Sequence, residues 1–151
     1  MKVRLKMLLV GILAMGMMGF IIFVRSQSDE TYKNLSNEVL KGQAAKAIAL
    51  ALVDKEECLK AGSQYFSEEE QNEWYVPYMD FLYDKGIFDP NVILPTRMSV
   101  ESYLTVGQLQ NVLKRLNLIE VSNQLLQADP LDKVSEAIWW KVYDKILESY
   151  D

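Results

Sequence analysis

The sequence predicts an all-α, mainly helical chain behind an apolar N-terminal segment, and three observations lead to this prediction. Apolar residues recur every three or four positions in four separate stretches, which is the spacing of an amphipathic helix. Glycine and proline lie near the ends of these stretches. No stretch alternates apolar and polar residues over the length of a full strand, so only paired strands of two or three residues are expected in the irregular parts.

Residues 1–25 predict a membrane anchor or a signal peptide. Residues 1–6 carry three basic side chains and no acid, and residues 7–24 are 18 uncharged, mostly apolar residues closed by Arg25. This length reaches the lower limit for a transmembrane helix, and a basic flank stays cytoplasmic. An uncleaved anchor is favoured because signal-peptide cores are shorter and no small-x-small cleavage site follows. The rest of the chain is then extracytoplasmic on a single-pass anchor, or secreted if the segment is cleaved.

Composition excludes several function classes. Four of the 16 basic residues precede residue 26 and all 21 acids follow it, so residues 26–151 carry a net charge of −9. Nucleic-acid binders show basic patches instead, so no nucleic-acid partner is expected. The chain contains no histidine and one cysteine, Cys58, which removes histidine-based catalysis and leaves too few ligands for a zinc site. Neither an enzyme activity nor a cofactor or metal site is expected.

Residues 26–38 are polar and predict a linker, and the domain is expected over 39–151. The first helix is predicted over 42–53, with one apolar stripe. Residues 54–73 are charged and irregular, and Ser67 with Glu70 has the form of a capping box or of a solvated turn.

An aromatic helix is predicted from Trp74 to about Gly86. Proline is tolerated in a first turn, and a Lys-Gly pair ends a helix in a left-handed cap. One face repeats at helical spacing, with Trp74, Tyr78, Phe81 and Leu82. This face is expected to be core, although its rings could also stack on sugars. Tyr75 and Tyr83 lie off this face and are candidates for ligand contact.

Residues 92–103 are expected to be extended or irregular. Thr105 and Gln108 then form a capping box that begins a helix with Leu109, Val112, Leu113 and Leu116 inward. A short helix is expected over 119–127. A last helix over 134–148 places Trp139, Val142, Tyr143 and Ile146 on one side, with Ser135 or Asp132 as its cap. Since Trp139 and Trp140 cannot both point inward, Trp140 is a candidate for partner binding.

Self-comparison reveals a weak repeat, because residues 39–50 and 104–116 share the scheme apolar, x, x, Gly, Gln and then an amphipathic helix. A third copy opens at Val134. With the aromatic helix and its Lys-Gly-Ile end, this order resembles the S-layer homology module of bacterial surface proteins. The repeats lie at about 39–90, 104–128 and 134–150.

This resemblance implies a small helical bundle with pseudo-threefold repeats that binds cell-wall polysaccharide non-covalently. The family's Thr-Arg-Ala-Glu repeat start supplies polar and basic groups to acidic sugars, and Lys41, Gln43, Thr105 and Gln108 occupy such starts here. The arginine position holds Lys41, Val106 and Glu136 in the three repeats. Only one of these three residues is a cation. The alternative to polysaccharide binding is therefore a scaffolding domain of the envelope or sporulation machinery, with an envelope protein as its partner.

The last helix, with its Trp-Trp pair, resembles a further arrangement. Divergent repeats of this kind stand between an anchor and the catalytic or binding region in proteins of the stage II sporulation protein D/LytB group. That resemblance implies a non-catalytic leader of a longer wall-lytic protein.

Overall fold

The computed structural model describes residues 38–60, 62 and 64–150. The predicted anchor over 7–24 and nearly all of the predicted linker lie outside these residues. Among the residues described, no helix has both the length and the hydropathy to cross a membrane.

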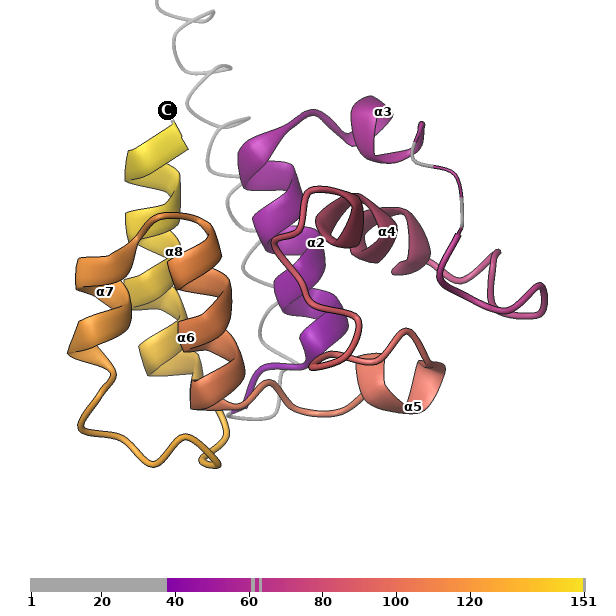
Figure 1. Ribbon diagram of the computed structural model, residues 1–151. Helices are drawn as coiled ribbons and strands as arrows, with labels where there is room; N and C mark the ends of the chain where they lie inside the picture. The colour runs from indigo at the N-terminus through magenta and orange to yellow at the C-terminus, as the bar shows by residue number, and fades with distance from the viewer. Residues whose placement is uncertain (1–37, 61, 63, 151) are drawn as a thin grey trace, which may run out of the picture. The chain divides into compact units, whose positions relative to one another are not determined.

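The described residues confirm a mainly helical fold (Figure 1). They contain no strand, only three isolated β-bridges. The helices are α2 (Lys41–Leu52), α3 (Lys55–Cys58), α4 (Val76–Asp84), α5 (Arg97–Val100), α6 (Val106–Arg115), α7 (Ile119–Gln124) and α8 (Glu136–Tyr150). Helix α2 packs against α3, α4, α5 and α8, while α6 pairs with α7.

Three chain segments meet in a closed ring of backbone hydrogen bonds. The Val39 amide donates to the Val134 carbonyl at 3.0 Å, and the Val134 amide donates to the Leu104 carbonyl at 2.8 Å. The Leu104 amide closes the ring on the Val39 carbonyl at 2.8 Å. All three side chains are buried, so the ring stands inside the core. Each member lies two residues before a helix, at the positions where the sequence comparison places the three repeat starts.

Two junctions between successive repeat starts share the same backbone pattern. The amide of Lys41, the first residue of α2, donates to the Ser102 carbonyl at 3.0 Å. The amide of Val106, the first residue of α6, donates to the Asp132 carbonyl at 2.8 Å. Both acceptors lie two residues before the next ring member, so the second junction repeats the first.

Glycines allow close approach at both junctions. A Cβ on Gly42 would lie 2.8 Å from Val100 Cγ1, and one on Gly107 would lie 3.1 Å from both the Cβ and the carbonyl oxygen of Pro130. Val100 and Pro130 each lie four residues before the next ring member. The glycine shared by the two repeat starts therefore has a packing reason.

The three helix starts share parts of one capping box. At α6 the box is complete, as predicted: the Gln108 amide donates to Thr105 Oγ1 at 3.3 Å, and Gln108 Oε1 accepts from the Thr105 amide at 3.1 Å. At α8 only the hydroxyl half remains, with the Ile138 amide donating to Ser135 Oγ at 3.3 Å. The predicted Ser135 cap is thereby confirmed. At α2 only the glutamine remains, because the cap residue is Leu40, which has no side-chain oxygen.

Predictions for the aromatic helix need two corrections. Helix α4 begins at Val76, so Trp74 precedes it and is 51% exposed, whereas Tyr75 is fully buried. Tyr83 is buried as well and donates to the Ile93 carbonyl at 2.7 Å. The expectation of one buried stripe is wrong because the flanking segments cover the outer side of α4. Ring contacts mark this cover, with centroid distances of 4.9 Å for Tyr65–Tyr83 and 5.6 Å for Phe66–Tyr75.

The predicted glycine stop is confirmed. Gly86 has φ of +67°, a conformation that glycine adopts without steric cost, and its amide donates to the Tyr83 carbonyl at 2.9 Å. Ser67 and Glu70 belong to a turn, and no helix begins there. Within this turn the Ser67 hydroxyl donates to the Glu70 carboxylate at 2.8 Å.

Two short helices occupy stretches that were predicted to be irregular. Helix α3 lies within 54–73, and α5 lies within 92–103. Thr96 caps α5 by accepting from the Ser99 amide at 3.3 Å. A four-residue helix carries too little periodicity to be recognised from its apolar residues.

The predicted inward faces of the later helices agree with the structure. Leu109, Val112, Leu113 and Leu116 are buried, as are Trp139, Val142 and Ile146. Tyr143 is half-buried and stacks on Trp139 with a centroid distance of 5.7 Å. Trp139 is buried and Trp140 is half-buried, so only one of the two tryptophans lies in the core, as expected.

Candidate functional site

The start of α2 holds a buried ammonium group. Lys41 is 8% exposed, and its Nζ donates to Ser102 Oγ at 2.6 Å. It makes no salt bridge with any acid among the described residues. Burial lowers the pKa of the amine, because the charged form loses hydration. An ammonium has three donors, so two N–H groups remain for an anionic partner.

Ser102 accepts hydrogen bonds from both the backbone amide and the side-chain ammonium of Lys41. Its carbonyl accepts from the Lys41 amide, and its hydroxyl donates onward to the Ser99 carbonyl at 2.7 Å. The lysine is therefore fixed at the first junction, between α2 and the end of α5. Sequence analysis identified Lys41 but missed Ser102, because 61 residues separate the two.

An aromatic ring borders the same helix start. A Cβ on Gly42 would lie 3.3 Å from Trp74 Cη2, so the half-exposed Trp74 ring lies directly against α2. The sequence had placed Trp74 in the core. The structure instead gives the start of α2 a cation and an accessible indole face.

Gln43 adds a buried acceptor to this region. Its Oε1 is buried and has no hydrogen-bond partner within the described part of the chain. The corresponding atom of Gln108 accepts from the Thr105 amide, which the α2 start does not reproduce. Lys41 and Gln43 thus offer a donor and an acceptor that the fold leaves incompletely used.

The other predicted ligand residues serve the fold or lie elsewhere. Thr105 and Gln108 are engaged in their own capping box, and Gln108 Nε2 also donates to the Val92 carbonyl at 3.4 Å. The expectation that Tyr75 and Tyr83 lie off the buried face is wrong, since both are core residues. Burial raises the pKa of both hydroxyls.

Trp140 lies on α8, in edge contact with Tyr143 at a centroid distance of 6.1 Å. The predicted residues therefore do not form one site. They divide among the start of α2, the start of α6, the core around α4 and one side of α8.

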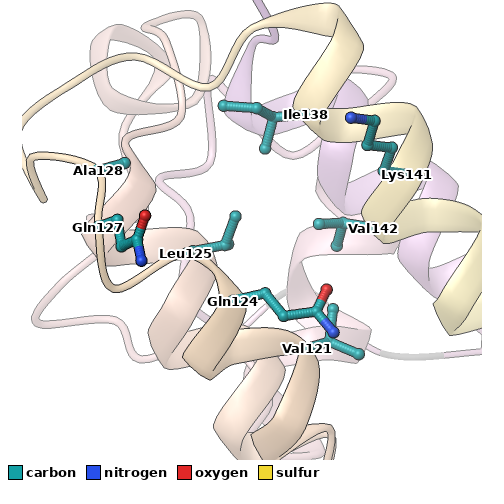
Figure 2. Close-up of a pocket in the computed structure, with 8 residues that line it drawn as sticks. All are labelled: Val121, Gln124, Leu125, Gln127, Ala128, Ile138, Lys141 and Val142. Carbon is teal, nitrogen blue, oxygen red and sulfur yellow. The ribbon is translucent and has the colours of Figure 1, made fainter.

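Sequence analysis missed a groove between α7 and α8, which Figure 2 shows. Its volume is about 470 Å³, and side chains of the two helices face each other across it. The lining consists of Val121, Gln124, Leu125, Gln127, Ala128, Ile138, Lys141 and Val142. The only sign in the sequence is the pair of glutamines three residues apart, which by itself predicts a solvated helix face.

A second hollow of about 470 Å³ adjoins the first. Ala128 and Ile138 line both. Its other lining residues belong to the second junction or are neighbours of the junction and the ring in sequence: Glu38, Val106, Leu131, Asp132 and Lys133.

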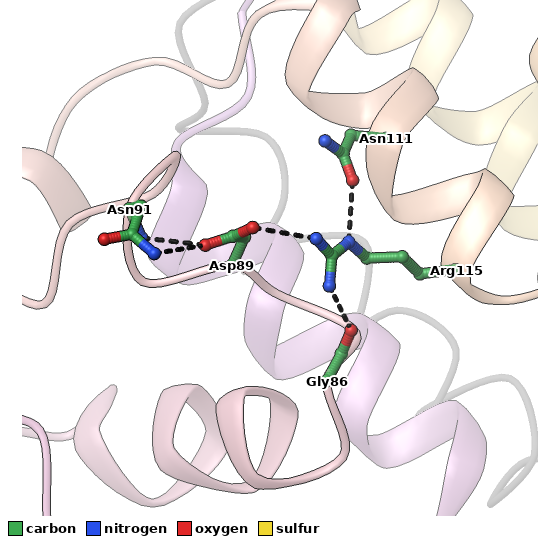
Figure 3. A network of polar contacts seen from close by, with 5 residues as sticks. All are labelled: Gly86, Asp89, Asn91, Asn111 and Arg115. Atoms are coloured by element: carbon green, nitrogen blue, oxygen red, sulfur yellow. Dashed lines mark hydrogen bonds and ion pairs between the residues drawn. The ribbon is translucent and has the colours of Figure 1, made fainter.

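A guanidinium ties α6 to the turn after α4, as Figure 3 shows. Arg115 donates to the Gly86 carbonyl, to Asp89 Oδ2 and to Asn111 Oδ1, each at 2.8 Å. These three bonds connect α6 with the turn after α4, so this network stabilises the fold.

No group of three or more potential metal ligands occurs in the described part of the chain. Comparison with protein-family models, with curated proteins and with solved structures finds no match for this chain.

Proposed function

We propose that this chain is a non-catalytic, extracytoplasmic module of the S-layer homology type that is tethered by residues 7–24. On this proposal it binds cell-wall polysaccharide non-covalently. The observation that carries it is the hydrogen-bonded ring of Val39, Leu104 and Val134. The resemblance implies a pseudo-threefold arrangement of repeats, and the ring joins the three positions that the sequence comparison aligned.

Lys41 is the group proposed to recognise the polymer. Its ammonium retains two donors after the Ser102 bond, and no described acid neutralises it. Charge-assisted hydrogen bonds to a carboxylate or phosphate substituent would use these donors. The indole face of Trp74 lies beside the same helix start and is suited to a sugar ring.

Co-sedimentation with cell-wall sacculi tests the proposal. The full chain in mild detergent is incubated with sacculi that retain their secondary polymer and with sacculi from which the polymer has been extracted. Binding is expected only in the first case. Lys41→Ala should weaken it about tenfold or more, since a lost charged hydrogen bond costs roughly 1.5–3 kcal/mol.

Lys46→Ala is the matched control, because Lys46 lies on the same helix and is exposed. Equal binding to both kinds of sacculi, or equal weakening by the two alanine variants, would refute recognition through Lys41.

A protein–protein scaffolding role is the second candidate, and a specific observation favours it. Val106 stands where the family pattern has a cation, is fully buried, and lines the hollow that adjoins the groove between α7 and α8. A photo-crosslinker placed at the exposed Leu126 near this groove should capture an envelope protein, whereas one at Leu50 on α2 should not. Equal capture at the two positions would remove this candidate.

A further inference from the structure

The two junctions share a backbone hydrogen bond at the first residue of the helix and differ in side-chain polarity. The position of Lys41 in the first junction is taken by the buried Val106 in the second, and the position of Ser102 is taken by Asp132. A carboxylate repels the anionic ligand that an ammonium would attract. The side chains of the second junction therefore do not offer the cation that Lys41 offers at the first.

The hollow at the second junction adjoins the groove between α7 and α8 that Figure 2 shows, because Ala128 and Ile138 line both. The two adjoining hollows have the size range of ligand pockets, and their shared wall is Ala128 and Ile138. Val121, Leu125 and Val142 complete an aliphatic floor, and the 82% exposed Leu131 forms part of the rim. The surface is suited to a large apolar side chain.

Apart from the Glu38–Lys133 ion pair, the two hollows carry one charged group of each sign. Asp132 lines the hollow at the second junction, and Lys141 lines the hollow between the helices. Both are exposed, and neither side chain has a hydrogen-bond or ion-pair partner among the described residues.

The exposed amides of Gln124 and Gln127 also line the groove. Each carries both a donor and an acceptor, which match the groups of a peptide bond. The described lining residues include no aromatic ring, so a stacking surface for a sugar is missing from them.

We propose that this groove binds a short peptide segment of a partner protein, with a large apolar side chain held between Ala128 and Ile138. A basic residue on one side of that anchor faces Asp132, and an acidic residue on the other side faces Lys141. This proposal is independent of polysaccharide binding at Lys41, because the two junctions use different residues.

Selection from a displayed library of random heptapeptides on the full chain in mild detergent tests the peptide chemistry. Selected sequences should share a large apolar residue with Lys or Arg on one side and Asp or Glu on the other. Selection on Ala128→Trp, which fills the shared wall, should enrich none of them. Gln124→Trp at the exposed rim gives a second blocked variant that leaves the core untouched.

A synthetic consensus peptide then tests the charges. Asp132→Asn and Lys141→Gln should each weaken binding about threefold, as expected for exposed ion pairs. The double variant Asp132→Lys with Lys141→Glu should prefer the peptide with exchanged charges.

Three outcomes overturn the proposal. Enrichment on the blocked variants equal to that on the unaltered chain would place peptide binding elsewhere, and no enrichment at all would exclude a peptide ligand. Self-association that Ala128→Trp abolishes, measured by sedimentation velocity, would assign the groove to a second copy of the chain instead.

Discussion

Arg115 donates from Nη2 to Asp89 Oδ2 at 2.8 Å and thereby joins helix α6 to the turn after α4 across 26 residues of sequence. Its other two bonds reach the Gly86 carbonyl and Asn111. The guanidinium thus uses its rigid, planar donor fork on three acceptors at once, and an ammonium lacks this planar geometry.

Replacing Arg115 is expected to loosen the connection between α4 and α6. The side chain is 36% exposed, so solvent screens the ion pair and discounts its contribution. With the two other hydrogen bonds included, Arg115→Ala should lower the free energy of unfolding by about 1 kcal/mol. Urea denaturation measures the change. Lys114→Ala, at the exposed neighbouring position, should have little effect, and equal losses would contradict a specific role for the guanidinium.

Removing the hydroxyl of Thr105 should destabilise the start of α6. Thr105→Val keeps the shape of the side chain but leaves the Gln108 amide without its cap, at a cost of about 1 kcal/mol. Thr105→Ser retains the oxygen and is the control. Thermal unfolding followed by circular dichroism should rank the serine variant close to the unaltered chain, and a valine variant of equal stability would disprove the cap's contribution.

A methyl group on Gly107 should disturb the second junction. It would lie 3.1 Å from the backbone oxygen of Pro130, which cannot rotate away as a side chain can. Overpacking of this kind costs about 1–3 kcal/mol and outweighs the better helix propensity of alanine. Gly62→Ala is the control, because nothing lies within 4 Å of a Cβ there. Chemical denaturation measures the stability of both variants. The prediction is wrong if Gly107→Ala is as stable as Gly62→Ala.

Stability should decrease at acidic pH through Glu70. The Arg97 amide, at 2.6 Å from Glu70 Oε1, is the main cause that lowers the pKa of this carboxyl, and the Ser67 hydroxyl adds to it. A lowered folded-state pKa gives stability that is complete above the ordinary value of 4.5 and is lost as pH falls through the folded value. The urea midpoint between pH 6 and pH 3 should fall less in Glu70→Gln. An equal fall in both proteins would exclude Glu70 as the cause.

Lys41 is expected to oppose stability while it serves binding. A buried ammonium with one neutral partner loses more hydration than a single hydrogen bond returns, as its lowered pKa indicates. Lys41→Met should therefore leave the free energy of unfolding unchanged or raise it by up to about 1 kcal/mol, while sacculus binding is lost. Joint measurement of urea unfolding and co-sedimentation tests this, and a clear loss of stability would assign the lysine a structural role.

Much of the fold follows from local features of the sequence. The complete capping box at Thr105, the apolar spacing of α6 and the Lys-Gly end of α4 all agree with the structure. Each depends on contacts between residues a few positions apart, and the chain's own geometry determines those contacts.

The similarity between the starts of α2 and α6 was also recognisable, because a Gly-Gln pair forms the second and third residues of both helices. The sequence placed Lys41 and Gln43 at the start of α2, but it could not reveal Ser102 as the partner of the lysine. It also assigned Trp74 to the core and Tyr75 to the surface, the reverse of what is observed.

The tertiary structure alone reveals the aromatic cover over α4, the ring of Val39, Leu104 and Val134, and the different polarity of the two junctions. The ring joins segments that lie 30 to 95 residues apart. A periodic pattern records which face of a helix is apolar, but not which distant segment will cover it. Burial and pairing across such distances are set by the packing of the whole domain. This packing places a lysine at the start of α2 and an apolar groove between α7 and α8.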